Sequence, residues 1–149
     1  QCCLVGSEMC IRDRVDAAIK KVKTVILFGY HGKLIKLAGG IFHTHNHLAD
    51  GRIEILVYLA VKANVPLEII VKLSHLTNLE DALLELERFN ESIAEKLFQY
   101  LSNMIEKRSF EYVNRYTNTD MHIAAILFDR KRKIRWSGLN GNDYISNFQ

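Results

Sequence analysis

The chain has 149 residues, 48% of them hydrophobic and 25% charged, which is typical of one globular domain. Its formal net charge of +3 suits an anionic small-molecule ligand but falls short of the clustered basic surface of a nucleic-acid-binding protein. No apolar run approaches the roughly 18 residues that a membrane-spanning helix requires. We therefore expect neither a nucleic-acid partner nor a membrane partner.

Residues 1–14 differ from the rest of the chain. The stretch Val5–Asp13 resembles the translation of a transposase sequencing adapter, so we interpret residues 1–14 as a sequencing remnant and leave them out of the fold argument. The alternative, a genuine helix start or cysteine-rich tail, stays open. An adapter joined directly to coding sequence predicts that the natural gene begins further upstream. The chain would then be a fragment of a longer protein.

All three cysteines, Cys2, Cys3 and Cys10, fall inside this remnant. The remaining chain therefore offers neither a disulfide framework nor a thiolate metal site. A cysteine-free body without a secretory signal indicates the cytoplasm.

The first elements after the remnant have the order of an α/β unit. Val15–Val22 has the pattern of the last turns of a helix. Thr24–Phe28 is a continuous apolar run rich in β-branched residues, typical of a buried strand in a parallel sheet. We expect Gly29–Gly32 to form a turn and Lys33–Ala38 a short helix that Gly39-Gly40 ends.

A helical block follows. The polar, histidine-rich stretch Ile41–Gly51 predicts a loop, and the apolar spacing of Arg52–Asn64 predicts a helix. Pro66 suits the first turn of a helix over Leu67–Leu73.

Two further helices are expected before the chain returns to the sheet. Thr77 and Glu80 have the spacing of a capping box, which predicts a helix start there. Asn90 or Ser92 would open the next helix, which could run to about Arg115.

The carboxyl-terminal part predicts two more strands. Met121–Phe128 is a second buried strand, Asp129–Lys133 a charged turn, and Ile134–Ser137 a strand nearer an edge of the sheet. We expect Leu139–Gln149 to be a polar, frayed tail. The fold class is helix-rich α/β with few strands and a central helical block. Because two or three strands make a poor sheet alone, we expect further strands from an absent amino-terminal part.

Two halves of the window from Gly29 to Asp50 carry the candidate chemistry. In the first half, Gly29–Lys33 follows a buried strand, where open α/β sheets bind ligands and free N–H groups at a helix start attract anions. An ordinary tight turn with a solvated lysine is the alternative. In the second half, His43, His45 and His47 alternate, so an extended segment would place them on one face, within reach of a metal or an anion. The alternative there is a polar loop.

The same window resembles a known family. Its residues match the carboxyl-terminal signature of CbiD-type methyltransferases at His31-Gly-Lys33, Lys36-Leu-Ala38, Gly40, Thr44-His45 and Ala49-Asp50. The strands Val25–Gly29 and Ile126–Asp129 are also similar to that family, and the resemblance extends over Val15–Gly138.

The resemblance implies a carboxyl-terminal domain over residues 15–138 of an enzyme of anaerobic cobalamin biosynthesis. Such enzymes transfer a methyl group from S-adenosylmethionine to C1 of cobalt-precorrin-5B, giving cobalt-precorrin-6A. Cobalt arrives within the substrate, so no protein metal ligand is implied. The chain's partners would be the cobalt-precorrin and the missing amino-terminal part, without which we expect the fragment to be inactive.

The resemblance also suggests site residues. Thr44, His45 and Asp50 are the candidate catalytic residues. Lys33, Lys36, His45 and Arg52 could meet substrate carboxylates. The candidates for binding the donor or the substrate are Gly29, His31, Gly32, Lys33, Lys36 and Gly40.

Two other functions remain open from the residues. His43-Thr-His45 with Ala49-Asp50-Gly51 resembles the opening motif of metal-dependent phosphoesterases of the polymerase-and-histidinol-phosphatase type. That chemistry requires further ligands downstream, where His75 and His122 are the histidines left. The third possibility is a non-catalytic tetrapyrrole-binding module.

Overall fold

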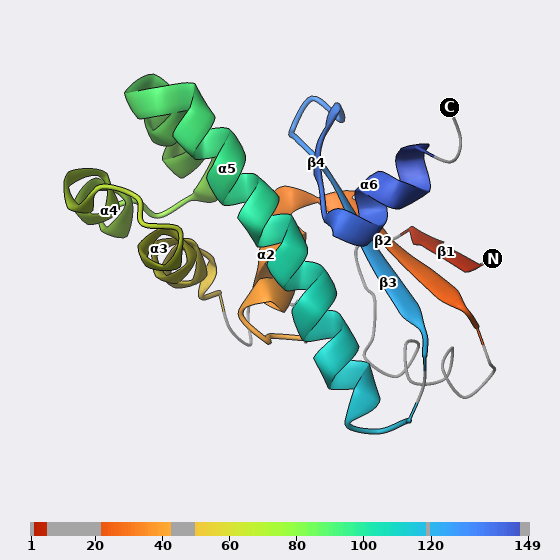
Figure 1. Ribbon diagram of the computed structural model, residues 1–149. Helices are drawn as coiled ribbons and strands as arrows, with labels where there is room; N and C mark the ends of the chain where they lie inside the picture. The colour runs from red at the N-terminus through yellow and green to blue at the C-terminus, as the bar shows by residue number, and fades with distance from the viewer. Residues whose placement is uncertain (1, 6–21, 43–49, 119, 147–149) are drawn as a thin grey trace.

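The structure is a computed structural model that describes residues 2–5, 22–42, 50–118 and 120–146 (Figure 1). Its sheet has the strand order β1-β2-β3-β4. The strands are β1 (Cys2–Val5), β2 (Thr24–Tyr30), β3 (His122–Phe128) and β4 (Ile134–Ser137). β1 and β3 both lie parallel to β2, and β4 pairs antiparallel with β3. The predicted α/β class with a central helical block is confirmed.

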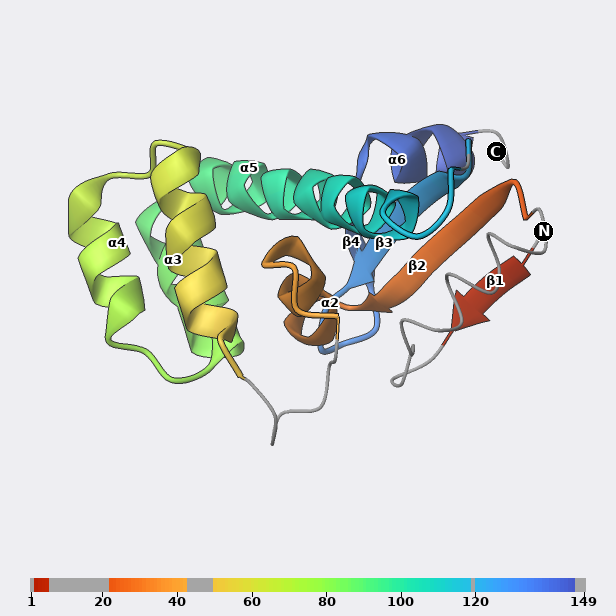
Figure 2. The ribbon, with the colours of Figure 1, turned by 90° about the horizontal axis from the view of Figure 1, so that it is seen from below.

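Helices cover both faces of this sheet. The helices of the described residues are α2 (His31–Ala38), α3 (Arg52–Lys62), α4 (Leu67–Ser74), α5 (Leu79–Asn114) and α6 (Leu139–Ser146). α2 and α5 pack on one face, and α6 packs on the other over Ile26, Ala124 and Ile126. Figure 2 places α3 and α4 with the start of α5 in a group beside the sheet. No helix among these is long and apolar enough to cross a membrane.

β1 falls inside the segment interpreted as a sequencing remnant, and that interpretation stays a prediction, as do the further strands. The helix expected over Val15–Val22 lies almost wholly outside the described residues.

The junction between β2 and α2 corrects one expectation. No turn separates them over Gly29–Gly32, because the strand continues to Tyr30 and the helix begins at His31. A Cβ at Gly32 would overlap Cε1 of Tyr30, so only glycine lets that ring pack against the helix start.

The predicted end of α2 is confirmed. Gly40 has φ +78°, and its N–H donates to the Leu37 carbonyl at 3.0 Å, while the Ile41 N–H donates to the Lys36 carbonyl at 2.9 Å. This pair of bonds is the Schellman arrangement, which favours glycine at the left-handed position.

α5 consists of two arms that meet at Asn90. Asn90 has φ −167° and ψ 113°, and its side chain accepts a hydrogen bond from the Ile93 N–H at 3.1 Å, so it caps the second arm as predicted. The predicted capping pair at the start of α5 is wrong by one residue. Asn78, rather than Thr77, is the cap, and it accepts from the Asp81 N–H at 2.9 Å.

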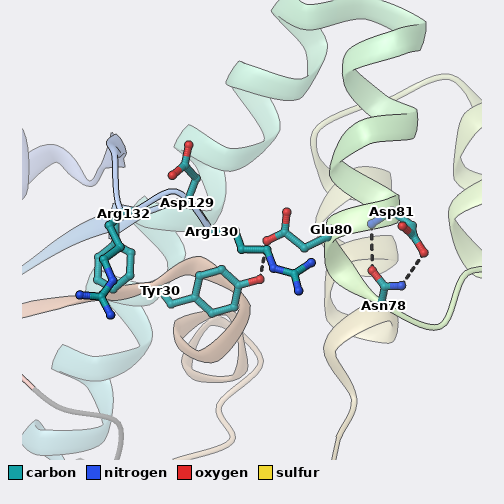
Figure 3. A pocket seen from close by; sticks show the side chains of 8 residues that line it. Tyr30, Asn78, Glu80, Asp81, Asp129, Arg130 and Arg132 are labelled. Atoms are coloured by element: carbon teal, nitrogen blue, oxygen red, sulfur yellow. Dashed lines mark hydrogen bonds between the residues drawn. The ribbon is translucent and has the colours of Figure 1, made fainter.

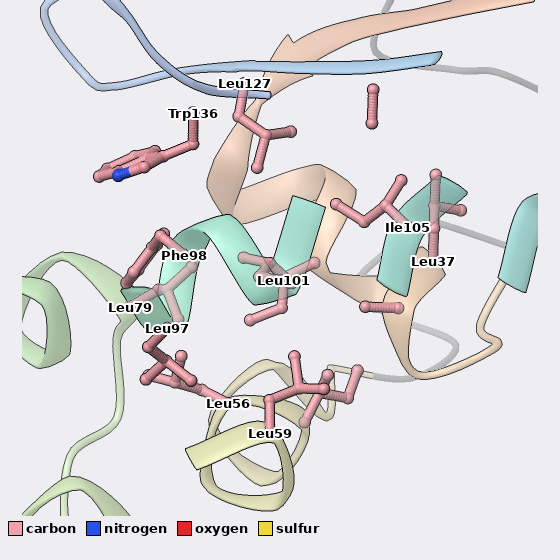
Figure 4. Close-up of a cluster of buried hydrophobic side chains, with 14 of the residues drawn as sticks. Leu37, Leu56, Leu59, Leu79, Leu97, Phe98, Leu101, Ile105, Leu127 and Trp136 are labelled. Atoms are coloured by element: carbon pink, nitrogen blue, oxygen red, sulfur yellow. The ribbon is translucent and has the colours of Figure 1, made fainter. Parts of the chain in front are cut away.

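One apolar core joins the helical group to the sheet (Figure 4). Leu56 of α3 and Leu101 of α5 are fully buried in it, as is Leu127 of β3. Trp136 of β4 packs on Phe98 with ring centroids 4.5 Å apart. The second arm of α5 is thus the element that both halves of the molecule share.

Leu139–Ser146 form the helix α6, which corrects the expected frayed tail over these residues, and residues 147–149 lie outside the described part of the chain. The buried Glu106 carboxylate of α5 accepts from the N–H groups of Asn140 at 3.1 Å and Gly141 at 2.9 Å, at the start of α6. It also accepts from the Ala125 N–H of β3 at 2.9 Å. This carboxylate supplies an acceptor that the polar sequence of α6 lacks at its own amino end.

Candidate functional site

A cavity of about 640 Å³ opens at the carboxyl ends of the parallel strands β2 and β3 (Figure 3). This is the edge where open α/β sheets bind ligands. The lining residues come from the end of β2, the start of α5 and the turn after β3. They are Tyr30, Asn78, Glu80, Asp81, Phe128, Asp129, Arg130 and Arg132.

Tyr30 and Glu80 form the centre of this cavity wall. The Tyr30 hydroxyl donates a hydrogen bond to Oε1 of Glu80, as Figure 3 shows. Burial, followed by this hydrogen bond to a carboxylate, raises the pKa of Tyr30, so the phenol remains protonated at neutral pH. Glu80 therefore keeps a fixed neutral donor while part of its side chain, 24% exposed, faces the solvent.

His31 lies behind this pair and has no exposed surface. Its Nδ1 lies 3.2 Å from the Phe128 carbonyl oxygen, which can only accept, so Nδ1 carries the proton. Its Nε2 has no hydrogen-bond partner and lies 3.4 Å from Oε1 of Glu80. Burial lowers the pKa of His31 although the charge of Glu80 acts in the opposite direction. The imidazole is therefore neutral at neutral pH and leaves the charge of Glu80 uncompensated.

The turn between β3 and β4 forms the opposite side of the cavity. Oδ1 of Asp129 accepts from the backbone N–H groups of Lys131 at 2.8 Å and Lys133 at 3.0 Å. The turn holds Arg132 at φ +62°, a left-handed conformation that is strained for arginine. Arg130 and Arg132 are both exposed, and neither forms an ion pair with any described residue.

A bulge in β4 fixes this side of the site to α5. Leu127 pairs with Trp136 and Phe128 with Ile134, so Arg135 is the extra residue. Neighbouring side chains in a regular strand point to opposite faces of the sheet. The bulge removes this alternation, so Arg135 and Trp136 both reach α5. The guanidinium binds Glu87 at 2.8 Å and Glu95 at 2.6 Å, and Nε1 of Trp136 donates to Glu95 at 2.7 Å. Because Glu87 and Glu95 flank Asn90, Arg135 joins the two arms.

Three of the predicted binding residues lie at the junction of β2 and α2, but each of them packs against a neighbouring side chain of the protein. His31 is buried behind Glu80, and Gly32 accommodates the Tyr30 ring. A Cβ at Gly29 would lie 3.0 Å from Cδ1 of Leu34. Gly40 lies at the far end of α2, where its positive φ ends the helix. Their proposed contacts with a ligand stay predictions.

The predicted basic residues lie on α2, which carries Lys33 and Lys36, and at the start of α3, which begins at Arg52. Lys33 is exposed, whereas Lys36 is 1% exposed, and its burial lowers its pKa. Arg52 binds Asp50 through two contacts, at 2.5 Å and 2.8 Å, and these lower the pKa of Asp50. The charge of Arg52 acts weakly on the pKa of Tyr30, in the direction that lowers it, but Arg52 does not line the cavity.

Two of the predicted catalytic residues, Thr44 and His45, lie outside the described residues, and so do His43 and His47. Within the described part of the chain, no three His, Cys, Asp or Glu residues are grouped so that they could hold a metal ion.

Sequence reasoning missed Tyr30, Glu80, Arg130 and Arg132 as site residues. Tyr30 follows the predicted strand by two residues, and Arg130 follows the other strand in the same way. The rule that parallel strands end at one edge could have found both of them. Glu80 is 50 residues from Tyr30, and its sequence signal indicated only a helix cap.

Comparison with known proteins identifies the family of this chain. The family model described as CbiD, C-terminal domain, matches residues 43–138. The chain belongs to the CbiD family. No solved structure matches it.

Curated relatives in this family are very similar. A cobalt-precorrin-5B C(1)-methyltransferase of Prochlorococcus marinus strain MIT 9312 is 82% identical over 135 residues, which cover 91% of this chain and 36% of the relative. The protein of the same name from strain MIT 9215 is 80% identical over 135 residues, with the same two shares. That of strain NATL1A is 50% identical over 132 residues, 89% of this chain and 35% of the relative. The CbiD chain thus spans about a third of the length of these relatives.

Proposed function

We propose that this chain is the carboxyl-terminal part of a methyltransferase that acts on C1 of cobalt-precorrin-5B. The donor is S-adenosylmethionine and the product is cobalt-precorrin-6A, in anaerobic cobalamin biosynthesis. The observation that carries the proposal is the 82% identity, over 135 residues, to a curated protein of that name. The match to the CbiD family favours this function over the phosphoesterase and the non-catalytic module.

The reaction is an in-line displacement at the methyl group of a sulfonium. The electron pair of the ring carbon forms the new bond to the methyl group, while the carbon–sulfur pair leaves with sulfur as a neutral thioether. Because the donor is already activated, the protein mainly has to align the two ligands and exclude water. Cobalt enters as part of the substrate.

We assign the region around Lys36 and Arg52 to the polyanionic macrocycle. Exposed Lys33 offers a cation to the carboxylates at the edge of the substrate, and Arg52 offers a guanidinium that Asp50 orients. Thr44 and His45, with Asp50, remain our candidates for residues that touch the reacting groups. In this proposal Gly29, His31, Gly32 and Gly40 shape the β2–α2 unit that carries them.

The segment requires the amino-terminal part found in its relatives, since it matches about a third of their length. We expect it to be inactive alone and to regain activity when it is joined to that part. We propose the cytoplasm as its location.

The test uses a full-length chimera, defined as the MIT 9312 relative in which the matching 135-residue segment carries the present sequence. The chimera is assayed for transfer of labelled methyl from S-adenosylmethionine to cobalt-precorrin-5B, with the parent relative as the control. Product of the expected mass, labelled at C1, supports the proposal. A folded chimera that gives no product while the parent is active contradicts it.

Single substitutions then test the residue assignment. Lys33→Ala, Thr44→Ala and His45→Ala in the chimera are each expected to lower substrate affinity or turnover. If all three variants keep both quantities, the assignment of this region is wrong even where the methyltransferase function holds.

A further inference from the structure

We propose that the cavity at the carboxyl ends of β2 and β3 is the binding site of the sulfonium donor. In this site Glu80 meets the sulfonium of S-adenosylmethionine, and Arg130 with Arg132 meets its carboxylate. The inference rests on the proposed function, because it assigns one of that reaction's two ligands to a part of the fold.

The formal charge of the cavity lining distinguishes between the methyl donor and the cobalt-precorrin as its ligand. The lining holds three carboxylates, on Glu80, Asp81 and Asp129, and two guanidinium groups, on Arg130 and Arg132. Its formal charge is therefore negative by one. The donor carries a sulfonium, an ammonium and a carboxylate, which together give one positive charge. A macrocycle fringed by carboxylates would be repelled by the same lining, so complementarity favours the donor.

Glu80 is the carboxylate best prepared for a cation. Asp81 is exposed and engaged with Asn78, and Asp129 is occupied by the backbone of its own turn. Glu80 is held in place by the Tyr30 hydroxyl, and its neutral neighbour His31 does not compensate its charge. A cationic ligand can therefore form an ion pair in a fixed, partly desolvated position, where such pairs are stronger than at the surface.

Aromatic rings and cavity size also fit the donor. Tyr30 and Phe128 line the cavity with ring centroids 6.4 Å apart, and Phe28 lies 5.3 Å from Phe128. Such rings offer faces to a sulfonium by cation–π attraction and to an adenine by stacking. The volume of about 640 Å³ lies within the range of roughly 300–1,000 Å³ that is common for small-molecule sites.

The test is isothermal titration of the full-length chimera with three probes, in the absence of cobalt-precorrin. S-adenosylmethionine and sinefungin both carry a cation at the position of the reacting centre. S-adenosylhomocysteine has a neutral thioether there. Glu80→Gln is expected to weaken the two cationic ligands by about 10-fold to 100-fold and the neutral one by much less. Glu91→Gln, an exposed position of the same helix, is the matched control and should change none of the three.

A second variant tests the cationic side of the cavity. The double variant Arg130→Ala/Arg132→Gly is expected to weaken all three probes by a similar factor of about tenfold, because each carries the same carboxylate. Both positions are exposed, so this variant keeps the inference testable even if Glu80→Gln does not fold.

The outcomes separate this inference from the proposed function. If Glu80→Gln binds all three probes as the unmodified chimera does, or weakens all three equally, Glu80 does not meet the sulfonium and the inference fails. If the donor affinity depends on Glu80 as expected but no methylated product forms with cobalt-precorrin-5B, the donor site stands and the proposed reaction fails.

Discussion

Both arms of α5 present a glutamate to the sheet, and the two sites differ in what satisfies the carboxylate. Glu106, on the second arm, is 6% exposed and accepts from three backbone N–H groups. Glu80, on the first arm, accepts from one phenol at the rim of a cavity. Backbone donors that have no other acceptor make the first a structural residue. A side-chain donor that leaves acceptor capacity makes the second available to a ligand.

Two glycines show how closely the backbone surrounds the Glu106 carboxylate. A Cβ at Gly138 would overlap the Glu106 carboxylate, and one at Gly141 would overlap the Ala125 carbonyl oxygen. The backbone approaches this carboxylate so closely that no ligand could share it. Burial raises the pKa of Glu106 although its three N–H donors favour the ionised form.

The largest expected effect comes from removing the structural carboxylate. Glu106→Ala leaves three backbone N–H groups, two of them buried, without an acceptor and should lower the free energy of unfolding by about 3 kcal/mol. Urea denaturation followed by circular dichroism measures the loss, and Glu106→Gln, which keeps one acceptor oxygen, should lose less. The control Glu111→Ala removes a half-buried glutamate of the same arm that pairs only with the side chain of Arg108 among the described ion pairs, and should cost below about 0.5 kcal/mol. Equal losses for Glu106→Ala and Glu111→Ala would remove the distinction between the two sites.

An intermediate effect is expected at the contact that joins the arms. Arg135→Ala breaks the pairs with Glu87 and Glu95 and the contact with the Trp136 ring, 4.4 Å from the guanidinium carbon. We expect a loss of about 1–2 kcal/mol, less than for isolated buried pairs because all three side chains are partly exposed. Chemical denaturation measures it. Arg88→Ala, an exposed arginine 4.0 Å from Glu85, is the control that should change little.

A smaller effect, of opposite sign, is expected in the β3–β4 turn. Arg132→Gly relieves the left-handed backbone at φ +62° and should raise the free energy of unfolding by up to about 1 kcal/mol. Lys131→Gly, one residue earlier and without a positive φ, should instead lower it. A thermal melt of both variants decides the sign, and a destabilised Arg132→Gly protein would contradict the strain argument.

The smallest effect is a pH dependence at the cavity. The pKa of His31 is lowered in the folded chain, so the unfolded chain binds more protons as the pH falls below about 6.5. Stability should therefore decrease as the pH falls through that value toward the lowered pKa. The groups that face this imidazole are Tyr30, Glu80, Asp129 and Arg135. Because Nε2 of His31 lies 3.4 Å from Oε1 of Glu80, protonation of His31 would compensate the charge of Glu80.

Donor affinity should fall by a few-fold where His31 becomes protonated in the folded chain, which is below the ordinary histidine pKa of about 6.5 because burial lowers the pKa of this imidazole. Calorimetry from about pH 7.5 downward, to the lowest pH at which the chimera stays folded, measures it. His31→Gln removes the group that titrates and should flatten this dependence of donor affinity on pH. Because Lys36 and Arg52 are kept, any pH dependence that they cause would remain in the variant. A pH profile identical in the variant would show that His31 does not control the charge at Glu80.

Patterning in the sequence predicted most of the fold, because apolar spacing dominates where elements are buried. The strand cores at Thr24–Phe28 and Met121–Phe128 are continuous apolar runs, and the helices beginning at Arg52 and Leu67 follow a 3.6-residue period. α6 was not predicted, since its amino end depends on Glu106, 34 residues away from Asn140. The shift of the cap from Thr77 to Asn78 reflects a choice between adjacent cap-forming side chains that local rules do not separate.

The candidate site was less predictable than the fold. The window from Gly29 to Asp50 contains Tyr30 and His31, but their partner Glu80 lies on another element, and only tertiary packing brings them together. The approach of Arg135 and Trp136 to one glutamate depends on a bulge, and an alternating strand pattern gives no sign of it. Residues 43–49, which hold Thr44 and His45, lie outside the described residues, so that half of the site stays a prediction.

Because α5 breaks at Asn90, the cavity lies between the first arm of this helix and the sheet that the second arm covers. Glu80 belongs to the first arm, while Tyr30 and Phe128 belong to the sheet that the second arm covers. The distance across the cavity is therefore set by the angle between the arms, and Arg135 ties both arms to β4. The same apolar core that packs both arms against the sheet holds this angle, and the ion pairs of Arg135 add a polar tie across the break, so the width of the cavity mouth depends on both.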